Sequence, residues 1–409
     1  MTIGIASPIS VGAFDEYLDN VSKDLASGLS ADYAPAVTTL AKEFLLAGHR
    51  LVIFTLDPKA RQELVLNGDN LTIYVAPGQS SSKIKRLIDP FLGRNVRMVN
   101  KLFDKNKIEL DVLSVHWTRE YAIASRKYID KIPVFVTVRD IIPYIIKTQK
   151  LNWRIYNWWI IYLMNEWVMR QKGFHFIANS EYTARSIQTY WGKKVPVIAN
   201  PTLDKYFDIE YASEDTNNNF EISTISISQP NDRRKNIVTL LNAFKYVRRK
   251  YPNISLNLIG QGFVKENPII REWEMEGLLQ NVKLKGAMKH GDVLAVLAHS
   301  HLMVHPSLEE TFGNTLIEAM AVGCPVIGGR NSGAVPFVLE NGKAGYLCDV
   351  TSADKLAEAI MKVLDSPSER SRISKYAKKY CFDNFSSRNI ANKYMKLFEN
   401  ISKISNEHL

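Results

Sequence analysis

The sequence predicts an α/β protein with two doubly wound parallel sheets, each in a Rossmann-like domain, facing one another across a cleft. Short apolar or β-branched runs alternate with longer helical patterns along most of the chain, which is typical of parallel sheets with right-handed crossovers. The chain also has 409 residues, more than one hydrophobic core usually organises. Two series of alternating elements therefore indicate two domains.

The expected strands fall into two groups, with helices such as 37–47 and 84–103 between them. In the first half, the strands are expected at 1–6, 50–56, 71–75, 111–116, 134–139, 175–178 and 195–198. In the second half, they are expected at 221–226, 255–259, 282–285, 301–305, 325–328 and 345–348. After residue 349 the pattern is helical to the end.

The join between the domains is expected after Asn200-Pro201, because a polar stretch at 213–219 soon interrupts the pattern. This predicts a first domain at 1–203, with a helix at 386–409 packing back on it, and a second domain at 204–385. Ligands of open parallel sheets bind beyond the carboxyl ends of the strands. With two such sheets facing one another, the natural site is the cleft between them.

Composition and charge narrow the class of protein. The chain is 46% hydrophobic and 23% charged, as in ordinary globular proteins. Its start lacks the pattern of a secretory signal, no apolar run is long enough to span a membrane, and three scattered cysteines form no disulfide framework or zinc site. We therefore expect a cytoplasmic protein.

Basic residues are concentrated in one part of the chain. Residues 81–200 hold 21 lysines and arginines against 9 acidic residues. Such a stretch suggests an anionic surface partner, either nucleic acid or membrane headgroups. A well-solvated face that aids solubility is the alternative.

The most informative stretch is residues 305–327, with the sequence HPSLEETFGNTLIEAMAVGCPVI. A strand is expected to end at its first residue, and a polar loop follows. Asn314 or Thr315 can then cap a short helix, which Gly323 closes. The N–H groups at the start of that helix form an anion site suited to a phosphate.

Two glutamates flank this helix start, with seven residues between them. Glu310 lies in the loop, where it can accept hydrogen bonds from sugar hydroxyls, and Glu318 lies one turn inside the helix, where it can reach a ribose diol. The spacing matches three parts of one ligand: a hexose, a diphosphate and a ribose. A buried loop and helix with two merely solvated glutamates is the alternative.

The same stretch resembles the signature of the retaining GT-B glycosyltransferases of family 4 (glycosyl transferases group 1), E-x-FG…EAMA-x-G-x-PVI with its second Glu after seven residues. The resemblance implies a GT-B fold, a nucleotide-sugar donor held by the second domain, and a catalytic role for Glu310. The donor-binding residues that it implies here are Phe312, Gly313, Asn314, Thr315, Leu316 and Glu318.

Other segments of the chain resemble the motifs with which the family binds its donor. In PNDRRKNIVTLLNAF (230–244), Lys235 is expected to pair with the diphosphate and Arg234 to assist, since negative charge develops there as the glycosidic bond breaks. Gly260 in LIGQG and Met288 in KGAMKHG match donor-facing positions, and Gly12 in SPISVGAF matches a glycine loop near the phosphates. A solvated turn is the alternative for Arg234 and Lys235, and an ordinary turn is the alternative for Gly260.

One departure from the family bears on catalysis. The segment VFVTVRDIIPY resembles a strand end that normally reads His-Asp, whereas this chain has Arg139-Asp140. Arg139 can hydrogen-bond a hydroxyl or phosphate but cannot act as a neutral acceptor, and Asp140 can cap the next segment. Both are retained as candidate catalytic residues. The change leaves open an altered acceptor, an altered donor or lost activity.

No cluster of His, Cys, Asp or Glu has the spacing of metal ligands, and the alternating His299, His301 and His305 indicate packing. We therefore expect neither a metal nor a cofactor beyond the nucleotide-sugar, for which UDP is favoured and GDP is the alternative. The resemblance implies retention by front-face attack, with the departing phosphate taking the acceptor's proton.

Two segments suggest a surface for the acceptor. Residues 83–107 predict an amphipathic helix, kinked or begun at Pro90, and residues 151–172 mix tryptophans with basic residues, a combination that suits a membrane interface. An internal helix with aromatic core contacts is the alternative for the second segment, and it is the favoured interpretation for Trp167. The apolar side of the first comprises Ile84, Leu87, Ile88, Phe91, Val99 and Leu102, its basic stripe comprises Arg94, Arg97, Lys101 and Lys105, and the tryptophans are Trp153, Trp158, Trp159 and Trp167.

The expected function is therefore that of a metal-independent, retaining hexosyltransferase in bacterial-type surface glycan synthesis, such as lipopolysaccharide O-antigen, capsule or exopolysaccharide. Its acceptor would be lipid-linked or a polysaccharide, reached from the inner face of the cytoplasmic membrane. A catalytically silent GT-B subunit that binds a partner or glycan is the alternative, motivated by Arg139. A nucleic-acid binder is not expected, because the chain lacks a recognisable reading module.

Overall fold

The computed structural model describes residues 1–29, 34–78, 93–148, 155–213, 219–226 and 228–407. The chain divides into two compact units. The first comprises Met1–Pro201 together with Ser387–Leu409, and the second comprises Thr202–Ser386. Each unit contains one sheet flanked by helices, which confirms the predicted fold class of two parallel-sheet α/β domains.

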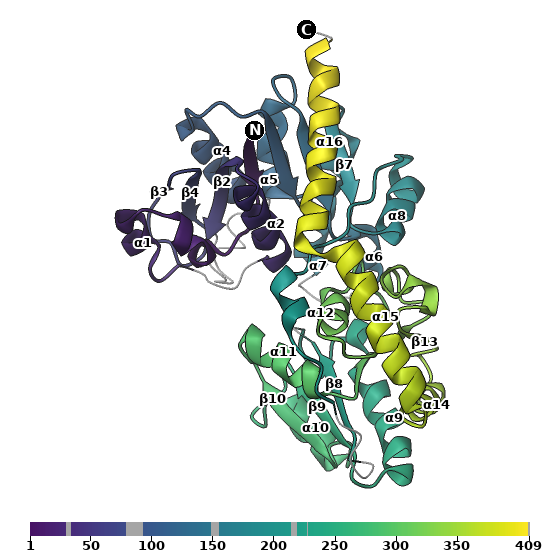
Figure 1. The fold of residues 1–409 in the computed structure, drawn as a ribbon. Coiled ribbons are helices and arrows are strands. Elements are labelled where there is room, and N and C mark those ends of the chain that lie inside the picture. The colour runs from purple at the N-terminus through teal and green to yellow at the C-terminus, as the bar shows by residue number, and fades with distance from the viewer. Residues whose placement is uncertain (30–33, 79–92, 149–154, 214–218, 227, 408–409) are drawn as a thin grey trace. The chain divides into compact units, whose positions relative to one another are not determined.

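The first unit is built on a seven-stranded sheet in the order β3-β4-β2-β1-β5-β6-β7 (Figure 1). Its strands pair in parallel, except that β3 runs antiparallel to β4 at the edge. The strands are β1 (Thr2–Ala6), β2 (Arg50–Asp57), β3 (Leu64–Asn67), β4 (Leu71–Pro77), β5 (Val112–His116), β6 (Val134–Val138) and β7 (Phe174–Ala178).

The helices of the first unit include the end of the chain. Tyr394 and Phe398 of the last helix, α16, lie against Phe44 of α2 with ring centroids 6.5 and 6.1 Å from it. The helical segments are η1 (Val11–Tyr17), α1 (Asn20–Ala26), α2 (Pro35–Leu46), α4 (Gly93–Lys105), α5 (Glu120–Ser125), η2 (Arg126–Tyr128), α6 (Ile142–Thr148), α7 (Ile155–Arg170), α8 (Glu181–Trp191) and α16 (Ser387–Glu407).

The second unit has a six-stranded parallel sheet in the order β10-β9-β8-β11-β12-β13. The strands are β8 (Glu221–Ile225), β9 (Ser255–Ile259), β10 (Val282–Gly286), β11 (Leu302–His305), β12 (Val326–Gly329) and β13 (Tyr346–Cys348). The helical segments are η3 (Asp204–Asp208), η4 (Arg233–Lys235), α9 (Ile237–Lys250), α10 (Pro268–Met275), α11 (His290–His299), α12 (Asn314–Val322), α13 (Val335–Val338), η5 (Glu340–Gly342), α14 (Ala353–Leu364) and α15 (Pro367–Phe385).

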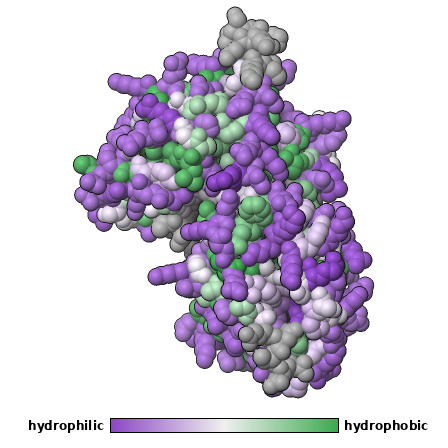
Figure 2. Space-filling view, viewed as in Figure 1, coloured by the Kyte–Doolittle hydropathy of each residue, from purple (hydrophilic) through white to green (hydrophobic). Residues whose placement is uncertain are grey.

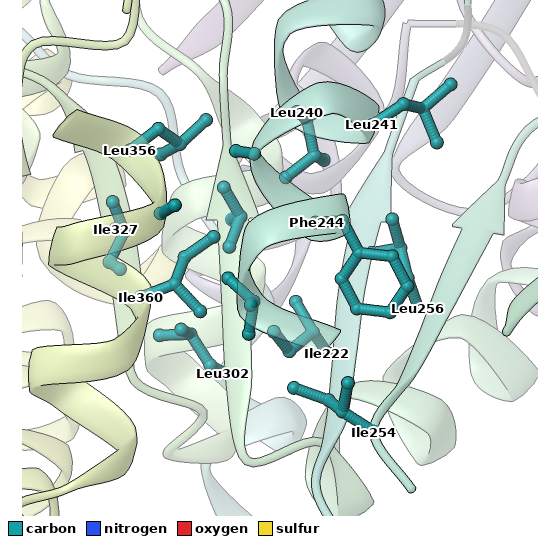
Figure 3. Close-up of a cluster of buried hydrophobic side chains, with 14 of the residues drawn as sticks. Ile222, Leu240, Leu241, Phe244, Ile254, Leu256, Leu302, Ile327, Leu356 and Ile360 are labelled. Carbon is teal, nitrogen blue, oxygen red and sulfur yellow. The ribbon is translucent and has the colours of Figure 1, made fainter. Parts of the chain in front are cut away.

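The core of the second unit lies between its sheet and the neighbouring helices α9 and α14. Phe244 and Leu240 of α9 point toward Leu256 and Ile222 of the sheet, and all four side chains are fully buried (Figure 3). Burying each side chain of this kind contributes about 1.5–3 kcal/mol. The sheet is therefore a rigid platform for the loops at its carboxyl edge.

The strand order reverses beside the first strand of each sheet. In the first unit β2 and β5 lie on opposite sides of β1, and in the second unit β9 and β11 lie on opposite sides of β8. Such a switch point is where open α/β sheets bind ligands, at the carboxyl ends of the strands. The loops after β1 and β5 in the first unit, and after β8 and β11 in the second unit, are therefore candidate binding sites.

The predicted strands are present within a few residues of their expected bounds, with one exception. The prediction of a strand at 195–198 is wrong, because only an isolated bridge joins Ala178 and Val197. The carbonyl of Pro196 accepts a hydrogen bond from Ala178 N, but Pro196 has no N–H with which to continue the strand pairing. The short edge strand β3 was not predicted.

The surface has mixed polarity. On the face shown in Figure 2, apolar side chains form small patches that hydrophilic residues separate. Among the helices of the described ranges, none combines the length and apolar character needed to cross a bilayer.

Candidate functional site

A lysine and a glutamate meet at the switch point of the second sheet. Lys235 follows β8 and Glu310 follows the neighbouring β11, and the lysine Nζ lies 2.6 Å from Glu310 Oε1. The two side chains are only 19% and 15% exposed. The structure thus brings together the two residues that the sequence predicted for the diphosphate and the sugar.

His305, the last residue of β11, is a second partner of the same carboxylate. Its Nε2 lies 3.1 Å from Glu310 Oε1, and its ring is almost completely buried. Burial alone would raise the pKa of Glu310, but the hydrogen bond from His305 and the charge of Lys235 hold that pKa well below its ordinary value. Glu310 is therefore an ionised acceptor at neutral pH.

The backbone of Glu310 is fixed by a close approach of Gly333. Gly333 has φ +62°, and a Cβ at this position would lie 2.3 Å from the Glu310 carbonyl oxygen. The next residue, Ala334, donates its N–H to that carbonyl over 2.8 Å. A glycine is required here so that the loop after β12 can support Glu310.

The loop that carries Lys235 is tied to its surroundings by its neighbours. Arg234 forms a salt bridge with Asp232 at 3.0 Å, and its carbonyl accepts a hydrogen bond from Leu308 N at 2.7 Å. Asn236 has φ +54° and donates from Nδ2 to the carbonyls of Pro306 and Val350. Arg234 is therefore engaged within the loop, whereas Lys235 points at Glu310.

Helix α12 begins differently from the prediction. Its N-cap is Gly313, which has φ +94° and makes no side-chain cap, so the prediction that Asn314 or Thr315 caps it is wrong. Thr315 instead directs its hydroxyl toward His305 Nδ1, 3.4 Å away. The predicted end at Gly323 is confirmed, because this residue is the left-handed C-cap.

The other residues around this helix start have different environments. Leu316 is fully buried beneath Gly313, and Phe312 packs edge-on against Phe385 with ring centroids 5.7 Å apart. Asn314 is half-buried. The side chains of Leu316 and Phe312 therefore shape the turn, and the start of the helix carries the positive end of the helix dipole.

Glu318 lies one turn further along α12 in a largely buried position. Its carboxyl group is 16% exposed and lies 3.8 Å from His290 Nε2. Burial raises the pKa of Glu318 to about 8. The ring of Tyr206 lies 5.3 Å from that of His290. Burial, and then the charge of the nearby Glu318, raise the pKa of Tyr206. His290 and Tyr206 were not predicted as site residues.

The two glycines of LIGQG have structural explanations. A Cβ on Gly260 would lie 1.8 Å from the carbonyl oxygen of Ser226, and one on Gly262 would lie 2.4 Å from Pro230 Cδ. Both are therefore needed for packing between the loops after β8 and β9. Met288 is half-buried in the segment before α11.

In the first unit, Arg139 is held by neighbours of its own sheet. It follows β6, is 6% exposed, donates to His116 Nδ1 at the end of β5 and to Asn200 Oδ1, and lies over the ring of Trp117. Burial and then the charge of Arg139 lower the pKa of His116 well below its ordinary value, so this histidine is a neutral acceptor. Asp140 is half-buried.

Gly12 lies in η1, which follows β1 at the switch point of the first sheet. It is half-buried, and a Cβ added to it would meet nothing within 4 Å. Packing therefore does not explain a glycine at this position. A direct role for Gly12, Arg139 or Asp140 in binding stays a prediction.

Within the described ranges, no group of three or more His, Cys, Asp or Glu side chains is placed to hold a metal ion. The three cysteines are buried and unpaired. Lys235 and the start of α12 are the positively polarised groups at the switch point of the second sheet, and this pairing suits an anionic ligand.

The fold and this site define a class of protein, the glycosyltransferases of the GT-B fold. The structure is similar to sucrose-phosphate synthase from Thermosynechococcus elongatus, with a TM-score of 0.73, 18% identity, and coverage of 97% of this chain and 98% of that one. It is also similar to Anabaena HepE in complex with UDP-glucose, with a TM-score of 0.66, 17% identity, and coverage of 98% and 100%.

The sequence matches two family models. Residues 219–380 match the model described as Glycosyl transferases group 1, and residues 35–202 match Glycosyltransferase Family 4. Together the two matches account for most of the chain. It therefore belongs to the GT-B glycosyltransferases of family 4, as the signature around Glu310 and Glu318 predicted.

Curated relatives are similar over part of the chain. N-acetyl-alpha-D-glucosaminyl L-malate synthase of Bacillus anthracis is 33% identical over 113 residues, which is 28% of this chain and 29% of that protein. Lipopolysaccharide 1,2-N-acetylglucosaminetransferase of Salmonella typhimurium is 28% identical over 173 residues, 41% of this chain and 45% of that protein. The matched region spans less than half the length of each of these relatives.

Proposed function

We propose that this chain is a retaining hexosyltransferase that moves a sugar from a nucleotide-sugar to a lipid-linked or polysaccharide acceptor in surface glycan synthesis. The observation that carries this proposal is the Lys235–Glu310 pair at a sheet switch point, beside the start of α12. UDP-sugars are favoured as donors and GDP-sugars are the alternative. Anabaena HepE, whose structures contain UDP and UDP-glucose, supports the choice of UDP.

The proposed binding mode assigns one part of the donor to each feature. The diphosphate lies between Lys235 and the N–H groups that open α12, the hexose hydroxyls donate to Glu310, and the ribose hydroxyls face Glu318. Arg234 acts through the loop, because its guanidinium is engaged by Asp232. The start of α12 and Glu310 are already held in place, whereas Lys235 must exchange its contact with Glu310 for the diphosphate.

In the proposed reaction, the bond between the anomeric carbon and the phosphate oxygen breaks as the acceptor oxygen attacks the same face of the sugar. The departing phosphate takes the acceptor's proton, and the configuration is retained. Lys235 and the start of α12 offset the charge that develops on the leaving diphosphate. Because these groups carry that role, we propose that the reaction needs no metal ion, and turnover in the presence of a chelator tests this.

The acceptor side rests on a specific surface of the first unit, which we name the α7 stripe: Trp159, Leu163 and Trp167. These side chains are 49%, 54% and 42% exposed, and their spacing of four residues places them on one helix face. Trp167 is therefore a surface residue rather than a core contact. Arg170 continues the stripe with an exposed basic group. Aromatic and basic side chains together suit an anionic membrane surface.

Helix α4 adds a second basic face. Val99, Leu102 and Phe103 are buried, which confirms the amphipathic character predicted for this part of 83–107. The exposed basic stripe comprises Arg94, Arg97, Lys101 and Lys105. The predicted apolar residues Ile84, Leu87, Ile88 and Phe91, and Trp153 of the other segment, lie outside the described residues. We propose a peripheral location on the inner face of the cytoplasmic membrane.

The direct test has two parts. Purified protein is screened by thermal shift against UDP- and GDP-sugars, because a ligand that binds only the folded state raises the melting temperature. Transfer and donor hydrolysis are then measured with the sugar that binds. Stabilisation with turnover supports the enzyme, whereas binding without any turnover would favour a catalytically silent subunit, the alternative that Arg139 motivates. No stabilisation by any sugar nucleotide would overturn both.

A further inference from the structure

His305 connects three elements of the second unit. It ends β11, its Nε2 lies 3.1 Å from Glu310 Oε1 in the following loop, and its Nδ1 lies 3.4 Å from the hydroxyl of Thr315 in the first turn of α12. Both ring nitrogens thus face a polar partner, although the ring is only 3% exposed. A purely apolar packing position would not provide two such partners.

The partner of Nε2 determines that this nitrogen carries a proton. A carboxylate only accepts hydrogen bonds, so Nε2 must donate to Glu310. In the Nε2–H tautomer, Nδ1 is the acceptor, and the Thr315 hydroxyl 3.4 Å away donates to it. The chain of hydrogen bonds therefore runs from Thr315 through His305 to Glu310.

Glu310 has two donors on a single oxygen. Oε1 accepts from both Lys235 Nζ and His305 Nε2. In the proposed function, the diphosphate of the donor attracts Lys235. Glu310 then loses its charged partner at the moment when it must present its carboxylate to the sugar. A glutamate side chain has several rotatable bonds, and a carboxylate without a second support would move.

We propose that His305 is a positioning residue that holds the Glu310 carboxylate in place when Lys235 turns to the donor diphosphate. This inference rests on the proposed function and extends it to a residue that touches no substrate. Thr315 supports the ring from the other side, which gives it a role different from the donor contact that the family resemblance implies. A misplacement of about 1 Å at such a group can cost 10²-fold in rate.

Two amide substitutions of His305 test whether this residue positions Glu310 or only fills space. The amide nitrogen of Gln reaches about as far as the Nε2 of histidine, whereas that of Asn reaches only as far as Nδ1. We expect His305→Gln to keep kcat within about tenfold of the parent and His305→Asn to lose about 10²-fold in kcat, with similar melting temperatures and little change in KM for the donor. Equal kcat values for the two variants would overturn the proposal, as would losses confined to KM.

A measurement without turnover checks the hydrogen bond itself. Nitrogen NMR of the protein with labelled histidines, with the His305 signal identified by its loss in His305→Gln, is expected to show the Nε2–H tautomer. Thr315→Val removes the hydroxyl at nearly constant shape, and we expect it to change the tautomer population of His305. Thr315→Ser keeps the hydroxyl, and we expect it to leave that population unchanged. A parent ring protonated at Nδ1 alone would overturn the proposal. Failure of the parent to bind any sugar nucleotide would instead overturn the proposed function.

Discussion

Lys235 and Glu310 partly neutralise one another in the absence of a donor, and each is positioned for a separate part of the ligand. The positive charge of the lysine suits the negative charge of a diphosphate, and the glutamate carboxylate accepts hydrogen bonds from neutral hydroxyls. Because both lie in loops fixed by backbone contacts to Leu308, Gly333 and Ala334, removing either side chain should leave the loops in place. Their contributions to catalysis are therefore measurable separately.

Replacing either of these residues with alanine should reduce turnover strongly. We expect Lys235→Ala and Glu310→Ala each to lower kcat by roughly 10²–10³, the scale for losing one preorganised electrostatic contact. Lys343→Ala removes an exposed lysine outside the site and serves as the matched control. Kinetics with the donor identified by thermal shift measure the effect, and full activity in either site variant would contradict the assignment.

The raised pKa of Glu318 predicts how stability depends on pH. Its pKa is about 8 in the folded protein, against an ordinary value of 4.5. Between these values the unfolded chain has lost a proton that the folded protein retains, so folding stability falls as pH rises from about 4.5 to about 8. We expect Glu318→Gln to flatten this part of the profile in denaturant titrations. Parallel profiles for the two proteins would be inconsistent with a buried, protonated Glu318.

At the scale of single elements, α7 differs from an ordinary surface helix. Its buried side includes Met164, Val168 and Met169, and the opposite side carries the α7 stripe of large apolar residues instead of the charged residues usual on a solvated face. Glu166, which lies beside the stripe, bonds Arg170 and the indole N–H of Trp191. The stripe is therefore presented by a helix that is well fixed at its end.

The α7 stripe should bind anionic membranes. We expect Trp159→Ser with Trp167→Ser to reduce co-sedimentation with vesicles that contain an anionic lipid, and added salt to weaken binding of the parent by screening its basic residues. Tyr246→Ser removes an aromatic residue of similar exposure from α9 and is the control. If the double variant binds as the parent does, the stripe is not the membrane contact.

Local patterns were enough to predict most of these elements but not the contacts among their side chains. The buried strands read as continuous apolar runs, and Gly323 was predicted correctly as the end of α12. The edge strand β3 is short and half-exposed, so its pattern was weak. The network of Arg139 depends on Asn200, 61 residues away, and the role of His305 depends on a helix start, neither of which periodicity reveals.

At the scale of the whole molecule, α16 completes the first unit from the far end of the sequence. Tyr394 is 1% exposed, and its hydroxyl lies 3.1 Å from that of Thr137 in β6. Ser387, at the start of the helix, donates to Glu43 of α2 over 2.6 Å. The core of the first unit therefore includes side chains that lie beyond the entire second unit in sequence.

Removing one of these side chains should affect the first unit selectively. We expect Tyr394→Ala to lower the free energy of unfolding by about 3–5 kcal/mol, the range for truncating a buried aromatic side chain. In calorimetry, the transition of the first unit should move to lower temperature, while a sugar nucleotide should still raise the transition of the second unit. A uniform shift of a single transition would show that the two units do not unfold separately.

The chain enters the second unit at Thr202 and leaves it at Ser386, and a hydrogen bond from Thr202 N to Phe385 O brings those two points side by side. The second unit is thus inserted into the sequence of the first unit, and its two ends lie next to one another. During synthesis on the ribosome, all of its residues are available before α16 emerges, whereas the first unit must wait for that helix. We infer that the first unit completes its core only after the whole of the second unit has been synthesised.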